Sequence, residues 1–309
     1  MKLKLISGIF LLMSFAWVSP AQLTMKKREG GILIVDGKEN VLMYQTAPKS
    51  KDGRFSRSNY IHPLYGLNGQ ILTEDFPADH LHHRGVFWAW HQVWIGDKQI
   101  GDPWELVDFE QDVVELEFMK GASESVEIRT EVDWKSRQWR LDGRIVPYLK
   151  EHAKITVHPS TGTYRKIDFE ISLLALVDDL KIGGSNDAKG YSGFSVRMKL
   201  PDDVKFSGKN GEVVPEVTAV KSDGFVNVSG TIGQFKGKGG IVIVDNPGNP
   251  GYPQSWILRD KNSMQNAVYP GNKLVPLSTT EPLVLKYSLL VYTGKMSSNK
   301  IEKIIQREY

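Results

Sequence analysis

Cysteine is missing from this chain of 309 residues. The protein therefore has no disulfide bond and no thiol nucleophile, and no cysteine follows the N-terminal apolar stretch to carry a lipid anchor. With 40% hydrophobic residues, a chain of this length buries enough apolar surface to fold without disulfides.

Long hydrophobic runs are confined to the N-terminus. Lys2 and Lys4 flank the start of a largely apolar stretch of 14 residues, Leu5–Val18, and Ser19-Pro20-Ala21 supplies small residues after it. This pattern predicts a secretory signal peptide over residues 1–21, since a spanning helix needs about 20 apolar residues. Because no later run approaches that length, we expect an exported protein, periplasmic or extracellular, with no integral membrane segment after cleavage.

An excess of one charge is also lacking. The formal net charge is +3, and removing Lys2 and Lys4 leaves about +1. No basic block or stripe occurs elsewhere in the chain. A nucleic-acid partner is therefore not expected, because binding a phosphate backbone requires clustered positive charge.

Helical periodicity is scarce after residue 21, and strand patterns are frequent. Val126–Trp134 alternates apolar and polar residues, which is typical of an antiparallel sheet with one buried and one wet face. Val86–Val93 and Trp139–Val146 are predicted as two further strands. Turn sequences such as Lys209-Asn210-Gly211 separate the strand segments and favour hairpins.

The strand patterns predict an all-β fold, a large two-sheet antiparallel β-sandwich that forms a single domain over residues 22–309. The number of predicted strands is more than about a dozen, which is larger than the seven of an immunoglobulin domain. This number suggests a galactose-mutarotase-like supersandwich. Ser297 or Ser298 is expected to cap a short C-terminal helix, in which Ile301, Ile304 and Ile305 form one apolar stripe.

Two common catalytic motifs are missing. No Gly-x-Ser-x-Gly nucleophile elbow occurs in the chain. Gly183-Gly184-Ser185 is not a phosphate loop, because no Lys-Ser or Lys-Thr follows it and no strand-to-helix context surrounds it.

Histidine, in contrast, is concentrated in one region. Five of the seven histidines fall between residues 62 and 91, and three of them lie within Asp79–Gly85, between Phe76-Pro77 and the aromatic segment Val86–His91. Buried imidazoles need hydrogen-bond partners, so such density is costly unless it serves a purpose. A titratable cluster among aromatic residues predicts a small-molecule pocket, although histidines that only cap loop backbone would give the same pattern. The candidate catalytic residues are His82, His83, Asp79, His80 and Arg84.

Two kinds of chemistry fit this cluster, and the sequence leaves both open. In an extended segment His80 and His82 share one face, and they could bind a divalent metal ion with a further ligand from His62, His91, Asp75, Asp102 or Glu105. In a metal-free site one histidine accepts a proton, a second group donates one, Asp79 orients an imidazole and Arg84 stabilises negative charge. We favour the metal-free site, because consecutive histidines in an extended segment point to opposite faces.

Other segments supply candidate substrate-binding residues. Tyr191 lies in the turn Lys189–Gly193, and Arg197 follows on an expected strand. The loop Asp245–Gly251 leads to Trp256 and Arg259. A flat indole beside a guanidinium suits the apolar face and hydroxyl rim of a sugar ring, whereas a core tryptophan after an ordinary loop is the alternative. The full set of candidates is His62, His91, Tyr191, Arg197, Trp256 and Arg259.

These motifs resemble the signature of a bacterial family labelled "methane oxygenase PmoA". The matching segments are Tyr60–Tyr65, Phe76–Gly85, Tyr191–Gly193 with Arg197, and Asp245–Pro250 with Trp256. The resemblance implies an exported protein that occurs together with sugar-degrading proteins. It does not imply a catalytic role for any particular residue. Methane oxidation itself is rejected, because the corresponding mono-oxygenase subunit is an integral membrane protein and this chain has no spanning segment after residue 21.

We therefore expect an exported carbohydrate-active enzyme, a hydrolase, lyase or epimerase that acts on a glycoside or modified sugar. Its ligand would be a small molecule or an oligosaccharide. The alternative is a non-catalytic carbohydrate-binding or cell-surface scaffold protein. A binding module has little use for three titratable imidazoles beside Asp79 and Arg84, which favours the enzyme.

Overall fold

The computed structural model describes residues 22–232 and 237–306, so the predicted signal peptide lies outside the described residues. Two nine-stranded antiparallel sheets dominate the fold. The first sheet has the spatial order β1-β2-β3-β6-β7-β15-β22-β21-β18. Its strands are β1 Leu23–Arg28, β2 Gly31–Asp36, β3 Glu39–Gln45, β6 Tyr60–Leu64, β7 Val86–Trp90, β15 Ser192–Val196, β22 Gln265–Val268, β21 Ser255–Ile257 and β18 Val220–Lys221.

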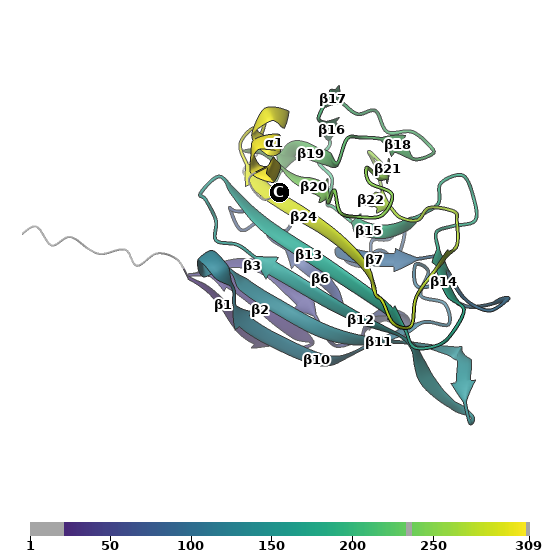
Figure 1. The fold of residues 1–309 in the computed structure, drawn as a ribbon. Helices are drawn as coiled ribbons and strands as arrows, with labels where there is room; N and C mark the ends of the chain where they lie inside the picture. The colour runs from purple at the N-terminus through teal and green to yellow at the C-terminus, as the bar shows by residue number, and fades with distance from the viewer. Residues whose placement is uncertain (1–21, 233–236, 307–309) are drawn as a thin grey trace, which may run out of the picture.

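The second sheet has the spatial order β10-β11-β12-β13-β24-β20-β19-β16-β17. Its strands are β10 Glu110–Lys120, β11 Val126–Leu141, β12 Arg144–Val157, β13 Tyr164–Ala175, β24 Leu283–Thr293, β20 Gly237–Asp245, β19 Phe225–Ile232, β16 Lys205–Gly208 and β17 Gly211–Glu212. In Figure 1 the teal strands of this sheet lie in front of the purple N-terminal strands of the first. A short 3₁₀ turn, Ala122–Glu124, joins β10 to β11.

Two smaller sheets complete the fold. A four-stranded sheet has the order β23-β14-β8-β9, and β4 pairs with β5 in a separate hairpin. These strands are β23 Val275–Pro276, β14 Leu180–Gly183, β8 Gln92–Ile95, β9 Lys98–Gly101, β4 Lys49–Lys51 and β5 Arg54–Arg57.

The core lies between the two large sheets. Every second residue of β7 points into it, and Trp88 of that strand lies 6.3 Å from Phe169 of the second sheet, measured between ring centroids. Phe194 of β15 stacks on Tyr287 of β24 at 4.7 Å. This facing arrangement confirms the predicted two-sheet antiparallel sandwich, whereas the galactose-mutarotase-like supersandwich stays a prediction.

A buried carboxylate links the two sheets. Glu151 of β12 is fully buried and accepts hydrogen bonds from Asn59 Nδ2 (2.7 Å), Trp88 Nε1 (2.7 Å) and Trp134 Nε1 (2.8 Å). Burial raises the pKa of Glu151 to about 7, and its three donors oppose that shift. The contact holds Trp88, and therefore β7, against the second sheet.

Two predicted strands differ from the structure. Trp139–Val146 is not one strand, because Asp142 and Gly143 have positive φ and form the turn of the β11–β12 hairpin. Val86–Val93 is interrupted at His91, which separates β7 from β8. The interruption matters for the site, since it places His91 at the end of β7.

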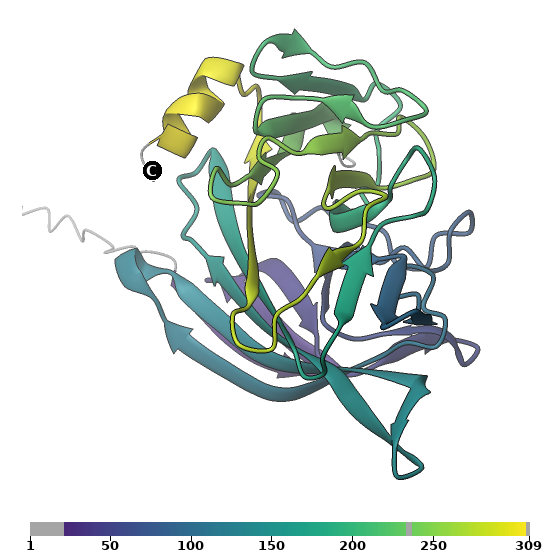
Figure 2. The ribbon, with the colours of Figure 1, turned by 45° about the vertical axis from the view of Figure 1, so that its right-hand side comes forward.

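The C-terminal helix is confirmed as α1, Ser298–Gln306. The Ser297 hydroxyl accepts a hydrogen bond from the Lys300 backbone N–H at 3.3 Å, so Ser297 is the cap. Ile301 and Ile304 pack in a cluster with Val242 and Leu290 on the outer face of the second sheet. Figures 1 and 2 both show α1 beside β24 and away from the blue strand β7. Within the described ranges, no helix is long and apolar enough to cross a membrane.

Candidate functional site

The histidine-rich segment belongs to the connection between β6 and β7 and covers the outer face of the first sheet. Phe87 and Ala89 of β7 point away from the main core and join Tyr60 and Trp104 in a separate apolar cluster. The His83 ring lies 6.1 Å from both Phe87 and Trp104, between ring centroids. Phe87, from the aromatic segment that follows the histidines, and Trp104 therefore form a floor beneath them.

Arg84 anchors this connection. It is fully buried, its Nε donates to Asp75 Oδ1 at 2.5 Å, and its Nη1 donates to the carbonyl groups of Lys49 (3.0 Å) and Phe55 (2.8 Å). Its Nη2 donates to the Tyr60 hydroxyl at 2.5 Å. We therefore assign Arg84 to holding the loop in place, and not to the charge stabilisation that the sequence suggested.

Gly85 is required where the loop enters β7. Its φ is +48°, and a Cβ built on it would lie 1.9 Å from the carbonyl oxygen of Ile61. Any other residue would push β6 and β7 apart at this point. The glycine therefore sets the position of the histidines that precede it.

His80, His82 and His83 meet in one group of rings. His80 stacks on His83 with centroids 4.6 Å apart and planes inclined by 5°, and His82 lies edge-on to His83 at 4.6 Å. The expectation that His82 and His83 diverge is wrong, because the segment is not extended. Backbone hydrogen bonds from His80 to Pro77 (3.1 Å) and from His83 to His80 (2.9 Å) fold it into turns.

Most of these imidazoles have a carboxylate at Nδ1. Asp79 Oδ2 lies 2.7 Å from His80 Nδ1, and Glu105 Oε2 lies 3.1 Å from His82 Nδ1. A carboxylate at Nδ1 favours the tautomer with its proton there and leaves Nε2 as the unprotonated nitrogen.

His83 has an arginine partner. Arg197 Nη1 lies 3.3 Å from its Nδ1, and the same guanidinium binds Asp79 through two nitrogens, at 2.9 and 2.8 Å. Arg197 Nε also donates to Glu74 at 2.8 Å. The structure thus brings together Asp79, His80, His82, His83 and Arg197, which are five of the candidate site residues.

Burial moves the proton affinities in this group. It lowers the pKa of His82 to about 3, with help from the neighbouring His80 and Arg57. Burial also holds the pKa of His83 far below its usual range, and His82 adds to the effect. The pKa of Glu105 is raised, chiefly by burial. At neutral pH the two imidazoles are therefore neutral bases beside a carboxyl group that binds its proton more tightly than usual.

A metal ion has no complete ligand set at this position. Among the residues that the structure describes, no group of three or more histidine, aspartate or glutamate side chains is placed to hold one. Of the carboxylates that were candidate metal ligands, Glu105 and Asp102 lie at the Nδ1 atoms of His82 and His91, and Asp75 pairs with Arg84.

Three of the expected substrate-binding residues line the adjoining surface. His91 stacks on Trp104 at 5.3 Å between centroids, and its Nδ1 lies 2.9 Å from Asp102 Oδ2. Tyr191 lies 5.6 Å from Trp104, and Arg259 Nη2 donates to the Tyr191 hydroxyl at 2.9 Å. His91, Tyr191 and Arg259 thus extend the histidine cluster into a wall around Trp104.

Two expected residues lie elsewhere. Trp256 is fully buried in the core between the sheets, so its indole is not offered to a ligand. His62 lies 3.0 Å from the Thr73 hydroxyl through its Nδ1, and burial lowers its pKa to about 4. The loop after Asp245 closes on itself, because Asp245 accepts hydrogen bonds from Asn249 (2.8 Å) and Gln254 (2.9 Å).

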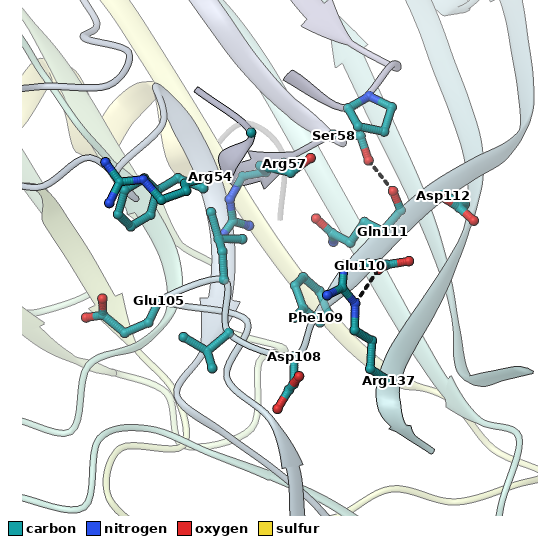
Figure 3. Close-up of a pocket in the computed structure, with 16 residues that line it drawn as sticks. Arg54, Arg57, Ser58, Glu105, Asp108, Phe109, Glu110, Gln111, Asp112 and Arg137 are labelled. Carbon is teal, nitrogen blue, oxygen red and sulfur yellow. Dashed lines mark hydrogen bonds and ion pairs between the residues drawn. The ribbon is translucent and has the colours of Figure 1, made fainter. Parts of the chain in front are cut away.

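The sequence named Glu105 only as a metal-ligand candidate and missed Arg57. A cavity of about 460 Å³ adjoins Glu105 (Figure 3). Strand β5, the segment 105–112 and Arg137 form its walls. No sequence signal pairs these segments, since the β5 residues precede Glu105 by about fifty positions and meet it only through folding.

Comparison with known proteins gives a family. No curated protein matches the chain. A family model does match, over residues 32–306, which includes the second large sheet, the first large sheet except β1 and Gly31, and every candidate site residue. The resemblance to the family labelled PmoA stays a prediction. The chain belongs to the family of unknown function DUF6807.

Proposed function

We propose that this protein is an exported enzyme that acts on a carbohydrate by acid–base chemistry, with His82 and Glu105 as the proton-transferring pair. The observation that carries the proposal is their geometry, with His82 Nδ1 3.1 Å from Glu105 Oε2. Their pKa values move in opposite directions, downward for His82 and upward for Glu105. Environments that separate two titratable groups in this way define an acid and a base.

The chemistry divides between the two groups. A neutral His82 accepts a proton from a sugar hydroxyl, a ring carbon or water, and Glu105, whose raised pKa favours binding a proton, passes one to the departing or isomerising oxygen. Arg197 positions Asp79 and His83 beside them. Hydrolysis, elimination and epimerisation each require one proton acceptor and one proton donor, and the pair supplies both.

The surroundings suit a sugar. Tyr191 offers a partly buried aromatic ring that packs against the buried Trp104, and Arg259, His91 and Asp102 place polar groups around it. Carbohydrate sites commonly combine an aromatic platform with a rim of donors and acceptors. The N-terminal signal-peptide pattern supports export, and the resemblance to proteins from sugar-degrading surroundings supports the substrate class.

The test is a turnover screen of the purified protein against oligosaccharides, glycosides and keto-sugars. On an active substrate, His82→Gln and Glu105→Gln should each lower kcat by about 10²- to 10⁴-fold, the range for losing a general acid or base. His152→Gln, at an exposed histidine on the second sheet, is the matched control and should leave kcat unchanged. Full activity of both site variants would overturn the proposal.

A non-catalytic scaffold gives a different result. In that case no substrate is turned over, and carbohydrate binding survives both His82→Gln and Glu105→Gln. Elemental analysis of untagged protein is a useful companion measurement. One equivalent of metal that is lost in His82→Gln would replace the metal-free mechanism with a metal-dependent one.

A further inference from the structure

One buried arginine differs from the others in its partners. Among the residues that the structure describes, four arginines are buried: Arg57, Arg84, Arg165 and Arg197. Three of them form ion pairs, Arg84 with Asp75, Arg165 with Asp36, and Arg197 with Asp79 and Glu74. Within the same described part of the chain, Arg57 pairs with no carboxylate. A buried cation without a counter-ion is costly, so its position needs a reason.

The contacts of Arg57 leave its charge unneutralised. Its Nη2 donates to the carbonyl of Pro103 at 2.5 Å, its guanidinium lies 5.1 Å from the Phe87 ring centroid, and its Nε is buried without a hydrogen-bond partner. Burial lowers the pKa of Arg57 to about 9, and the nearby Arg84 adds to that shift. The negative charges of Glu151 and Asp102 raise the pKa of Arg57 by electrostatic attraction, without forming an ion pair with it. Arg57 is still charged at neutral pH.

Arg57 also lines the cavity of about 460 Å³ beside Glu105. Figure 3 shows its guanidinium directed between Arg54 and Gln111. The buried side-chain oxygen of Gln111 has no partner either, so two residues that line this cavity each carry a buried polar atom without a hydrogen-bond partner. The volume lies within the range of small-ligand pockets and suits a mono- or disaccharide.

The acidic residues of this cavity are already engaged. Glu110 lies 3.5 Å from Arg137 Nε, Asp112 lies 2.6 Å from Lys135 Nζ, and Asp108 accepts a hydrogen bond from Gln138 at 3.1 Å. Their remaining oxygens suit sugar hydroxyl donors. Because Arg54 and Arg57 have no carboxylate partner in the described residues, the cavity retains positive charge on the β5 side.

We propose that this cavity binds an acidic sugar, a uronate, whose carboxylate pairs with Arg57. The sugar identity rests on the proposed function, whereas the preference for a carboxylate rests on Arg57 and its missing counter-ion. Glu105 borders the cavity and also contacts His82, so a uronate held here extends toward the proton-transferring pair. This names the substrate class of the proposed enzyme.

The first experiment uses the unaltered protein. Isothermal titration at pH 7 and low salt compares D-galacturonate and D-glucuronate with the corresponding uronamides and neutral hexoses. The amide keeps the approximate shape of the carboxylate, loses its charge and replaces one acceptor oxygen with an NH2 donor. We expect a Kd at least about 10-fold lower for one uronate than for its amide, because a charge-assisted bidentate contact is lost. Equal affinity for the two, or no binding of either, would overturn the proposal.

Two variants then locate the site. Arg57→Gln should abolish the preference for the uronate, and Arg57→Lys should keep part of it. Val107→Trp should lower uronate affinity at least about 10-fold by filling the cavity, since Val107 is an exposed residue of its wall and its replacement leaves Arg57 intact. Arg144→Gln, on the exposed β11–β12 hairpin, is the charge-matched control with unchanged affinity. A uronate preference that survives both Arg57→Gln and Val107→Trp would place the site elsewhere and refute the assignment.

The two proposals fail in different ways. Uronate binding without turnover of any uronide would support the carboxylate site and count against the enzyme. Turnover of neutral sugars that depends on His82, with no preference for uronates, would support the enzyme and overturn the carboxylate site.

Discussion

Histidine–carboxylate pairs occur in two regions of the molecule, and burial separates them. On the outer face of the second sheet, His152 lies 3.2 Å from Glu131 and its side chain is 55% exposed. In the loop between β6 and β7, His82 lies 3.1 Å from Glu105 and is only 10% exposed. The distances are alike. Water screens the first pair, whereas the aromatic floor and the neighbouring rings exclude water from the His82 ring of the second pair, whose Glu105 is still 43% exposed.

The origin of the difference lies in how each region is built. On β11, β12 and β13 polar residues alternate with core residues, so Glu131, Lys150 and His152 project from a wet sheet face. On β7 both faces are buried, because the loop that carries the histidines folds back over Phe87. Pairing alone therefore does not identify a site. The close packing of several imidazole rings and their burial from solvent are what indicate a site.

The largest effect on stability should come from removing the anchor of the buried loop. Arg84→Met leaves Asp75 buried without its guanidinium partner, and the free energy of unfolding should fall by about 3–5 kcal/mol. Denaturant unfolding followed by tryptophan fluorescence measures the change. Lys154→Met removes an exposed partner of Glu170 on the second sheet and should cost no more than about 1 kcal/mol. Equal losses in the two variants would remove the distinction between the regions.

A smaller effect should appear in the dependence of stability on pH. His82 has a folded pKa of about 3, below its ordinary value of 6.5, so the unfolded chain binds the proton first as the pH falls. This group's contribution is complete above about pH 6.5 and is lost as the pH falls toward 3. Between pH 7 and pH 5 the His82→Gln variant should lose about 1–2 kcal/mol less stability than the unaltered protein. An identical pH dependence in both proteins would show that His82 is not held neutral.

The smallest effect should come from the exposed pair. His152→Gln should change the free energy of unfolding by no more than about 0.5 kcal/mol, because an exposed ion pair gains little over its hydrated groups. Denaturant unfolding at pH 7 and pH 5 checks both the value and its pH dependence. A loss above 2 kcal/mol would mean that the face of the second sheet is as tightly coupled to folding as the histidine loop.

Part of the site could be predicted because its residues are neighbours in the chain. Asp79, His80, His82 and His83 share a short segment, so any fold of that segment brings them near one another. Of the flanking aromatic residues, Phe87 lies beneath the rings. Arg197 was found by its residue type, and the structure places it across the sheet on Asp79. Trp256 was chosen by the same reasoning and lies in the core, since residue type does not distinguish the two faces of a strand.

The sequence by itself determined the architecture of this protein. Alternation of apolar and polar residues along Val126–Trp134 and its neighbours requires sheets with a dry and a wet face, and two such sheets bury their dry faces against each other. Tertiary structure alone decided the chemistry. Backbone turns at His80 and His83 place the three imidazole rings in contact. The 102–109 segment places Glu105 beside His82. Strand β5 places Arg57 where, among the described residues, no carboxylate pairs with it. The pKa of a side chain and the pairing of its charge depend on its burial from solvent and on neighbours that are distant in the chain. Burial and such neighbours are established only when the chain folds.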